Sequence, residues 1–147
     1  MARLRSRVAV TLEVPVARAW EAWTTADEWN KWFTSRASID LRVGGAYSNA
    51  DHDCGEFLEI VPRRLLRFSW NNPEHGPGSV VTVLFIALGR QRCRLELTHS
   101  RLKTEKDAQG FRTGWSWAYA SLRNYLATGN GIRYDEWAAA QSAGKET

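Results

Sequence analysis

Apolar and polar residues alternate near the start of the chain, which is the pattern of a half-buried strand. The alternation covers residues 3–14 and ends where Pro15 removes a backbone hydrogen-bond donor. The apolar positions share one parity and are Leu4, Val8, Val10, Leu12 and Val14. We therefore expect one face of this strand to pack against the core.

Helical spacing replaces the alternation directly after the proline. Two short apolar stripes recur three to four residues apart and predict two short helices. The stripes are Val16, Trp20 and Trp23, and then Trp29, Trp32 and Phe33. Thr25, followed three residues later by Glu28, has the pattern of a capping box, so we expect the second helix to begin there.

The middle of the chain is predicted to form six further strands. Their ranges are 39–43, 46–50, 56–61, 66–70, 79–88 and 91–100. Turns rich in Gly, Pro, Asn and Asp separate them, including Gly44-Gly45 and the long segment 71–78. Because short turns join consecutive strands, the sheet is expected to be antiparallel.

A long helix is predicted over residues 111–126, with Gly129 as its C-cap. Its apolar stripe consists of Phe111, Trp115, Tyr119, Leu122 and Leu126. Residues 101–109 are polar and are expected to form a loop. Trp117 lies about 200° around this helix from Trp115, so it should face away from the sheet. Its expected cover is the tail, through Ile132 and Trp137, or else a second subunit.

These elements predict an α+β fold in which a curved antiparallel sheet holds a long C-terminal helix. We expect one domain over residues 1–147, with its core at 3–127 and a tail at 128–147 that has a weak apolar set and a frayed polar end. A long helix held against a curved sheet can enclose an apolar chamber. The pattern therefore indicates a ligand pocket more clearly than it indicates a reaction.

Charge and cysteine content narrow the classes of function. The formal charge is +4, but no basic run interleaved with aromatic residues indicates nucleic-acid binding. Glu59 and Glu96 lie near arginine clusters and are expected to pair with them. Two cysteines make neither a disulfide framework nor a closed zinc site, so a reducing, cytoplasmic setting is expected. No signal peptide or membrane span is predicted.

Four segments in order resemble a known family. They are 19–24 (AWEAWT) with 31–33 (KWF), 41–47 (LRVGGAY), 55–60 (GEFLEI) running into Pro62, Arg64, Leu65 and Trp70, and 95–100 (LELTHS) with the later Gly114-Trp115. Over about residues 7–127 the chain resembles the family named after the activator of the ninety-kilodalton heat-shock-protein ATPase. That family belongs to the START-like, helix-grip superfamily, which also holds polyketide cyclases.

The resemblance implies a seven-stranded antiparallel sheet curved around a long C-terminal helix, with two short helices after the first strand. This agrees with the element order read from the residues. It also implies a possible interaction with a chaperone, by analogy with the co-chaperone that gives the family its name.

The densest group of potential metal ligands is Asp51-His52-Asp53-Cys54. Adjacent residues of an extended segment point to opposite faces, so four in a row rarely converge on one ion. A polar hairpin turn is therefore the preferred interpretation, and no metal or other cofactor is expected.

His99 shares the parity of the apolar positions Cys93, Leu95 and Leu97, so its side chain should point inward. Two interpretations are open. His99 is either a core histidine whose ring nitrogens are satisfied by neighbours, or a hydrogen-bonding or acid–base group in a cavity.

Large aromatic side chains supply the walls of the expected pocket. Trp115 and Tyr119 lie one helical turn apart, and the Tyr119 hydroxyl needs a partner if it is buried. The candidate ligand-binding residues are Trp32, Phe33, Trp70, His99, Trp115, Tyr119 and Leu122. For each, plain core packing is the alternative.

Three hypotheses of function follow. The first is a binder of a small apolar or aromatic molecule, held between the sheet and the long helix and not an enzyme. The second is an enzyme of the cyclase or hydratase type that moves protons with His99 or Tyr119. The third is a protein-interaction module. A monomer and a homodimer are both compatible with the sequence.

Overall fold

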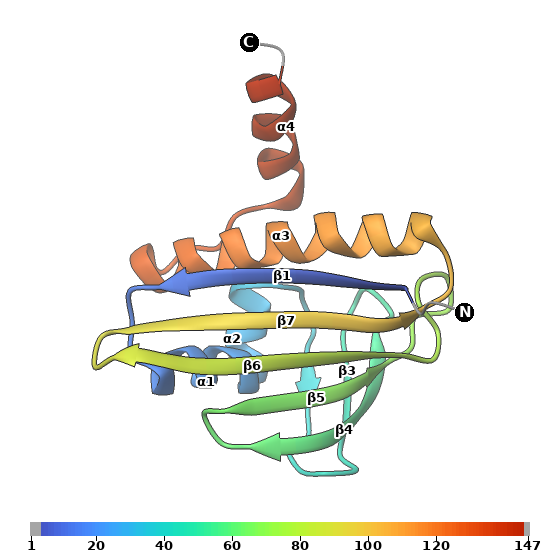
Figure 1. Ribbon diagram of the computed structural model, residues 1–147, viewed down its shortest axis with the longest axis horizontal. Coiled ribbons are helices and arrows are strands. Elements are labelled where there is room, and N and C mark those ends of the chain that lie inside the picture. The colour runs from blue at the N-terminus through green and yellow to red at the C-terminus, as the bar shows by residue number, and fades with distance from the viewer. Residues whose placement is uncertain (1–3, 146–147) are drawn as a thin grey trace.

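The computed structural model describes residues 4–145, and its centre is a seven-stranded antiparallel sheet (Figure 1). The elements are β1 Leu4–Leu12, α1 Val16–Thr24, α2 Ala26–Trp32, β2 Ser38–Ile39, β3 Ala46–Ser48, β4 Cys54–Val61, β5 Leu65–Trp70, β6 Ser79–Gly89, β7 Arg92–Leu102, α3 Glu105–Thr128 and α4 Tyr134–Lys145. The strands lie in the order β1-β7-β6-β5-β4-β3-β2. The predicted meander is confirmed, and β1 pairs with β7. Arg3, where the first strand was expected to begin, lies outside the described residues.

The long helix α3 runs along β1 and covers the inner face of the sheet. The short helices α1 and α2 lie near the C-terminal half of α3 (Figure 1). Alternate residues of the strands point toward α3 and form the core. Its largest fully buried side chains are aromatic or leucine: Trp23, Trp29, Trp32, Tyr47, Tyr119, Phe57, Phe68, Leu12, Leu66, Leu95, Leu97 and Leu122. The expected α+β architecture is therefore confirmed.

The helix α3 begins six residues earlier than its apolar stripe predicts. Thr104 caps it, because its side chain accepts a hydrogen bond from the Asp107 amide at 3.0 Å. Glu105 and Asp107 place negative charge in the first turn, where the helix dipole favours it. Polar residues thus start this helix, and the prediction of a loop over residues 101–109 was wrong. The expected C-cap, Gly129, adopts a left-handed conformation with φ of 88°.

Glu28 does not form the predicted capping box. No side-chain cap hydrogen bond is made at Thr25. Glu28 instead turns into the protein, where it accepts a hydrogen bond from the Tyr125 hydroxyl at 2.7 Å and pairs with Arg18 at 2.7 Å. This cluster joins α1, α2 and α3, so the carboxylate contributes to tertiary packing and not to local helix initiation.

The chain after α3 forms a further helix where a frayed tail was expected. The alanines of α4 favour helix, and the helix projects away from the rest of the molecule (Figure 1). On the outer face of the sheet, the predicted charge pairs Arg67–Glu59 and Arg94–Glu96 are formed. Within the described residues, no helix is both long and apolar enough to cross a membrane.

Candidate ligand-binding cleft

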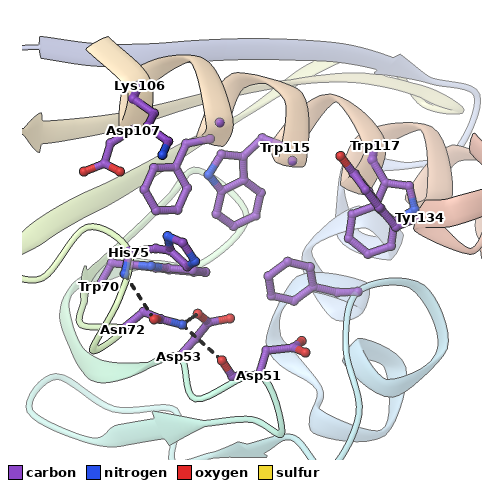
Figure 2. Close-up of a pocket in the computed structure, with 14 residues that line it drawn as sticks. Asp51, Asp53, Trp70, Asn72, His75, Lys106, Asp107, Trp115, Trp117 and Tyr134 are labelled. Atoms are coloured by element: carbon purple, nitrogen blue, oxygen red, sulfur yellow. Dashed lines mark hydrogen bonds between the residues drawn. The ribbon is translucent and has the colours of Figure 1, made fainter. Parts of the chain in front are cut away.

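A cleft of about 600 Å³ opens between the N-terminal half of α3 and two loops, the turn between β3 and β4 and the segment between β5 and β6 (Figure 2). Six aromatic side chains line it: Phe33, Trp70, Phe111, Trp115, Trp117 and Tyr134. Its polar lining consists of Asp51, Asp53, Asn72, His75, Lys106 and Asp107. Such a volume with mostly apolar walls is typical of small-molecule sites.

The aromatic walls hold one another in place. Phe33 stacks on Trp115, with ring centroids 5.3 Å apart and planes inclined by 15°. Trp70 meets Trp115 edge to face at 5.5 Å and Phe111 at 5.9 Å. Trp115 is only 3% exposed, so one part of it belongs to the core and another part to the cleft. These contacts preorganise a flat apolar surface on which a ring could stack.

Two glycines of α3 leave the helical side of the cleft without side chains. Gly110 and Gly114 lie one turn apart and both line the cleft. A Cβ added at either position would meet no atom within 4 Å. Glycine inside a helix destabilises it by about 0.5–1 kcal/mol relative to alanine, and no packing contact here requires its small size. The consequence is an open stripe along α3 that faces the aromatic wall.

The acidic side of the cleft is held together by Asn72. Its side-chain amide donates to the Asp53 carboxylate at 2.9 Å and to the Asp51 backbone carbonyl at 3.0 Å. Its side-chain oxygen accepts from the His75 amide at 3.2 Å. Asn72 therefore joins the β3–β4 turn to the β5–β6 segment, as Figure 2 shows. Asp53 is buried, and burial, with the Asp51 charge added, raises the pKa of its carboxyl despite hydrogen bonds from Asn72 and Asn49.

The far end of the cleft is formed by Trp117 and Tyr134 (Figure 2). The Trp117 indole donates to the Ile132 carbonyl at 2.7 Å, and its ring meets Tyr134 edge to face at 5.8 Å. Trp137 packs against Tyr134 at 6.0 Å. The expectation that the tail covers Trp117 is confirmed, although Tyr134 makes the ring contact that was expected of Trp137.

His99 lies behind the cleft wall and not in the cleft. Its side chain is fully buried, as its parity predicted. The Trp115 indole donates to Nδ1 at 3.1 Å, so Nδ1 is an acceptor and the ring proton is on Nε2. Nε2 then donates to the Ser79 hydroxyl at 2.7 Å, and Ser79 donates to the Gly76 carbonyl at 2.5 Å. Burial lowers the pKa of His99 to about 3, so the ring is neutral at physiological pH.

Three other expected site residues also lie in the core. Tyr119 and Leu122 are residues of α3 whose side chains are buried, and Trp32 borders a separate depression of about 300 Å³ that residues 130–133 also line. The Tyr119 hydroxyl and the Trp23 indole N–H approach each other without forming a hydrogen bond, and neither has another partner within residues 4–145. Burial raises the pKa of Tyr119 well above its usual range. Of the seven expected residues, Phe33, Trp70 and Trp115 line the main cleft.

The turn Asp51-His52-Asp53-Cys54 does not converge as metal ligands would. Asp51 accepts a hydrogen bond from the Thr34 hydroxyl at 2.7 Å, while Asp53 turns inward to Asn72. His52 has a φ of 68°, which reverses the chain at this point. Across the part of the chain that the structure describes, no three His, Cys, Asp or Glu side chains are grouped as a metal site.

Sequence reasoning missed the polar side of the cleft and its open helical stripe. Asp51 and Asp53 were considered as potential metal ligands or as a polar turn and not as the lining of a pocket, and Asn72 was placed in a long loop. The glycines at 110 and 114 did carry a usable signal, since two glycines one turn apart inside a helix are costly.

The family model described as "Activator of Hsp90 ATPase homolog 1-like protein" matches residues 13–127. The chain belongs to this family. No match is found among curated proteins.

Solved structures with the same fold place this family member among helix-grip proteins. CalU16 from Micromonospora echinospora shares 26% identity with a TM-score of 0.68, over 80% of each chain. DynU16, a protein of the dynemicin biosynthetic locus, shares 27% identity with a TM-score of 0.77. The match covers 89% of this chain and 50% of DynU16. The Aha1 dimer from Colwellia psychrerythraea has a TM-score of 0.76 at 20% identity, over 87% of this chain and 99% of that one, which shows the fold alone.

Proposed function

We propose that the protein binds a small apolar or aromatic molecule in the cleft between α3 and the loops β3–β4 and β5–β6. The observation that carries this proposal is the open stripe at Gly110 and Gly114, which faces a wall of aromatic rings. Helical glycines with empty space around them weaken the helix and serve no packing contact. A ligand that occupies this space accounts for them.

The stacked geometry of the wall supports a ligand with at least one flat ring. Phe33 and Trp115 form a nearly parallel pair, and Trp70 stands across them. Aromatic rings prefer offset stacking or edge-to-face contacts. The likeness to DynU16, a protein of a biosynthetic locus, is in keeping with a small-molecule role.

The alternative of a cyclase or hydratase that uses His99 or Tyr119 has less support. Neither residue lines the cleft, His99 is sealed by Ser79 and Trp115, and its depressed pKa makes it a poor base at neutral pH. The alternative of a protein-interaction module is weakened by the cover that the chain's own tail provides for Trp117.

The proposal is tested by filling the stripe. N-phenyl-1-naphthylamine is an uncharged aromatic probe whose fluorescence rises in an apolar site. We expect saturable binding to the natural protein and to Gly114→Ala, and at least a tenfold loss of affinity in Gly114→Leu, because the isobutyl group occupies the cleft.

The matched control is Thr113→Leu, which adds an apolar group to the neighbouring, exposed position of the same helix outside the cleft. Circular dichroism checks that each variant is folded. Equal affinity of Gly114→Leu and Thr113→Leu would contradict the proposal, as would the absence of saturable binding to the natural protein.

A further inference from the structure

The net charge of the groups that line the cleft is opposite in sign to the net charge of the whole chain. Asp51, Asp53 and Asp107 contribute three carboxylates, and Lys106 contributes one ammonium. His75 and Tyr134 also line the cleft. The chain as a whole carries a formal charge of +4, so the acidic character of the cleft does not follow from overall composition.

The carboxylates share the cleft with aromatic side chains. Figure 2 shows Asp51 and Asp53 on one side of the cleft and Asp107 on another, with Trp70 and Trp115 between them. Aromatic faces attract cations through the ring quadrupole, and carboxylates attract them by charge. An anion placed in the same cleft would meet repulsion from both kinds of group. The chemistry of this lining therefore favours a positively charged organic molecule.

The acidic side of the cleft is held in place by hydrogen bonds. Asn72 fixes Asp53 through a 2.9 Å hydrogen bond and holds Asp51 next to it. Asp53 is only 8% exposed, and its pKa is raised by burial and by the Asp51 charge. A bound cation would relieve this unfavourable pairing of two carboxylates. At the aromatic side, Trp70 is 5% exposed and its indole N–H has no acceptor within residues 4–145.

From these observations we propose that the natural ligand is an aromatic molecule that carries a protonated amine or another organic cation. Its ring system stacks on the wall of Phe33, Trp70 and Trp115, and its positive charge lies toward Asp51 and Asp53. This inference rests on the proposed function, because it names the chemical class of ligand for the same cleft.

Three acridines of nearly equal size test the inference. At pH 7.5, 9-aminoacridine is a cation, acridine is neutral and acridine-9-carboxylate is an anion. We expect 9-aminoacridine to bind about tenfold more tightly than acridine at low ionic strength, and acridine-9-carboxylate to bind most weakly. Raising the salt concentration should reduce the difference, because the cleft is open to solvent.

Two variants separate the cleft carboxylates from net charge. In Asp51→Asn, which replaces one cleft carboxylate by an amide of nearly the same shape and changes net charge by the same one unit as the control, the preference for 9-aminoacridine should fall by at least threefold. The control is Asp40→Asn, whose exposed carboxylate pairs with Arg42 outside the cleft, and it should keep the preference.

Isothermal titration or fluorescence titration gives the three affinities. Four results would each overturn the inference: equal affinities, tightest binding of acridine-9-carboxylate, no binding of any acridine, or an unchanged preference for 9-aminoacridine in Asp51→Asn. The proposed function is judged separately by N-phenyl-1-naphthylamine. If the natural protein binds this probe and Gly114→Leu loses that binding, the proposed function is supported even when the acridines show no dependence of affinity on charge.

Discussion

The neutral, buried His99 predicts a specific loss of stability in mild acid. In the folded protein its pKa is about 3, whereas in the unfolded chain it is about 6.5. Below pH 6.5 the unfolded chain therefore binds a proton that the folded protein does not bind. Acid favours the unfolded state in this range, and above pH 6.5 the effect vanishes because neither state is protonated.

The size of the effect follows from the gap between the two pKa values. Each pH unit below the unfolded pKa lowers the free energy of unfolding by about 1.4 kcal/mol until the folded pKa is reached. At pH 5.0, about 1.5 units below the unfolded pKa, His99 should lower the free energy of unfolding by about 2 kcal/mol. This is a large fraction of the 5–15 kcal/mol typical of a small domain.

The assay compares the natural protein with His99→Gln by urea unfolding at pH 7.5 and pH 5.0, followed by tryptophan fluorescence. Glutamine does not titrate, and its side-chain amide can accept from the Trp115 indole and donate to Ser79. We expect the natural protein to lose about 2 kcal/mol more than the variant between the two pH values. All carboxylates, and His52 and His75, are present in both proteins, so their contributions cancel.

Equal losses in the two proteins would refute the reasoning, because they would show that His99 takes up a proton without unfolding. Nitrogen-15 NMR of the imidazole gives an independent check. The protonated nitrogen should be Nε2, since Nδ1 accepts from the Trp115 indole.

Three further predictions concern stability. Tyr119→Phe should be neutral or stabilising, by up to about 1 kcal/mol, because it removes a buried hydroxyl without a partner; a loss above 1 kcal/mol on urea unfolding would show that the hydroxyl is bonded. Gly131→Ala should destabilise by about 1–3 kcal/mol, since its Cβ would lie 2.3 Å from the Lys31 carbonyl oxygen. Gly110→Ala, whose added Cβ meets open space, should instead stabilise the protein by about 0.5–1 kcal/mol. Shifts in melting temperature of the same sign for Gly131→Ala and Gly110→Ala would contradict these two predictions.

Elements with a regular apolar period were predictable because their periodicity reflects local geometry. The first strand, the two short helices and the hairpin strands were all found in the expected order. His99 was correctly placed inside by parity alone, since side chains of a strand alternate between faces. The family resemblance led to the same architecture.

Two features that depend on polar residues, the start of α3 and the role of Glu28, were mispredicted. The start of α3 at Glu105 carries no apolar stripe, so the periodicity does not report it. Glu28 has the spacing of a capping box, yet the carboxylate binds Arg18 and Tyr125, which lie far from it in sequence. A local pattern cannot show which distant partner competes for the same side chain.

By itself the sequence determined the fold class, the inward face of each strand and the presence of an aromatic wall, because each follows from spacing along one element. Only the tertiary structure decided which aromatic residues border a cleft. Trp70 and Trp115 lie at its edge, while Tyr119 and Leu122 lie in the core, although all were expected in one pocket. The difference arises because the loops that carry Asp51 and Asn72 stand apart from the N-terminal half of α3. That separation depends on how distant segments pack, and no spacing along the chain encodes it.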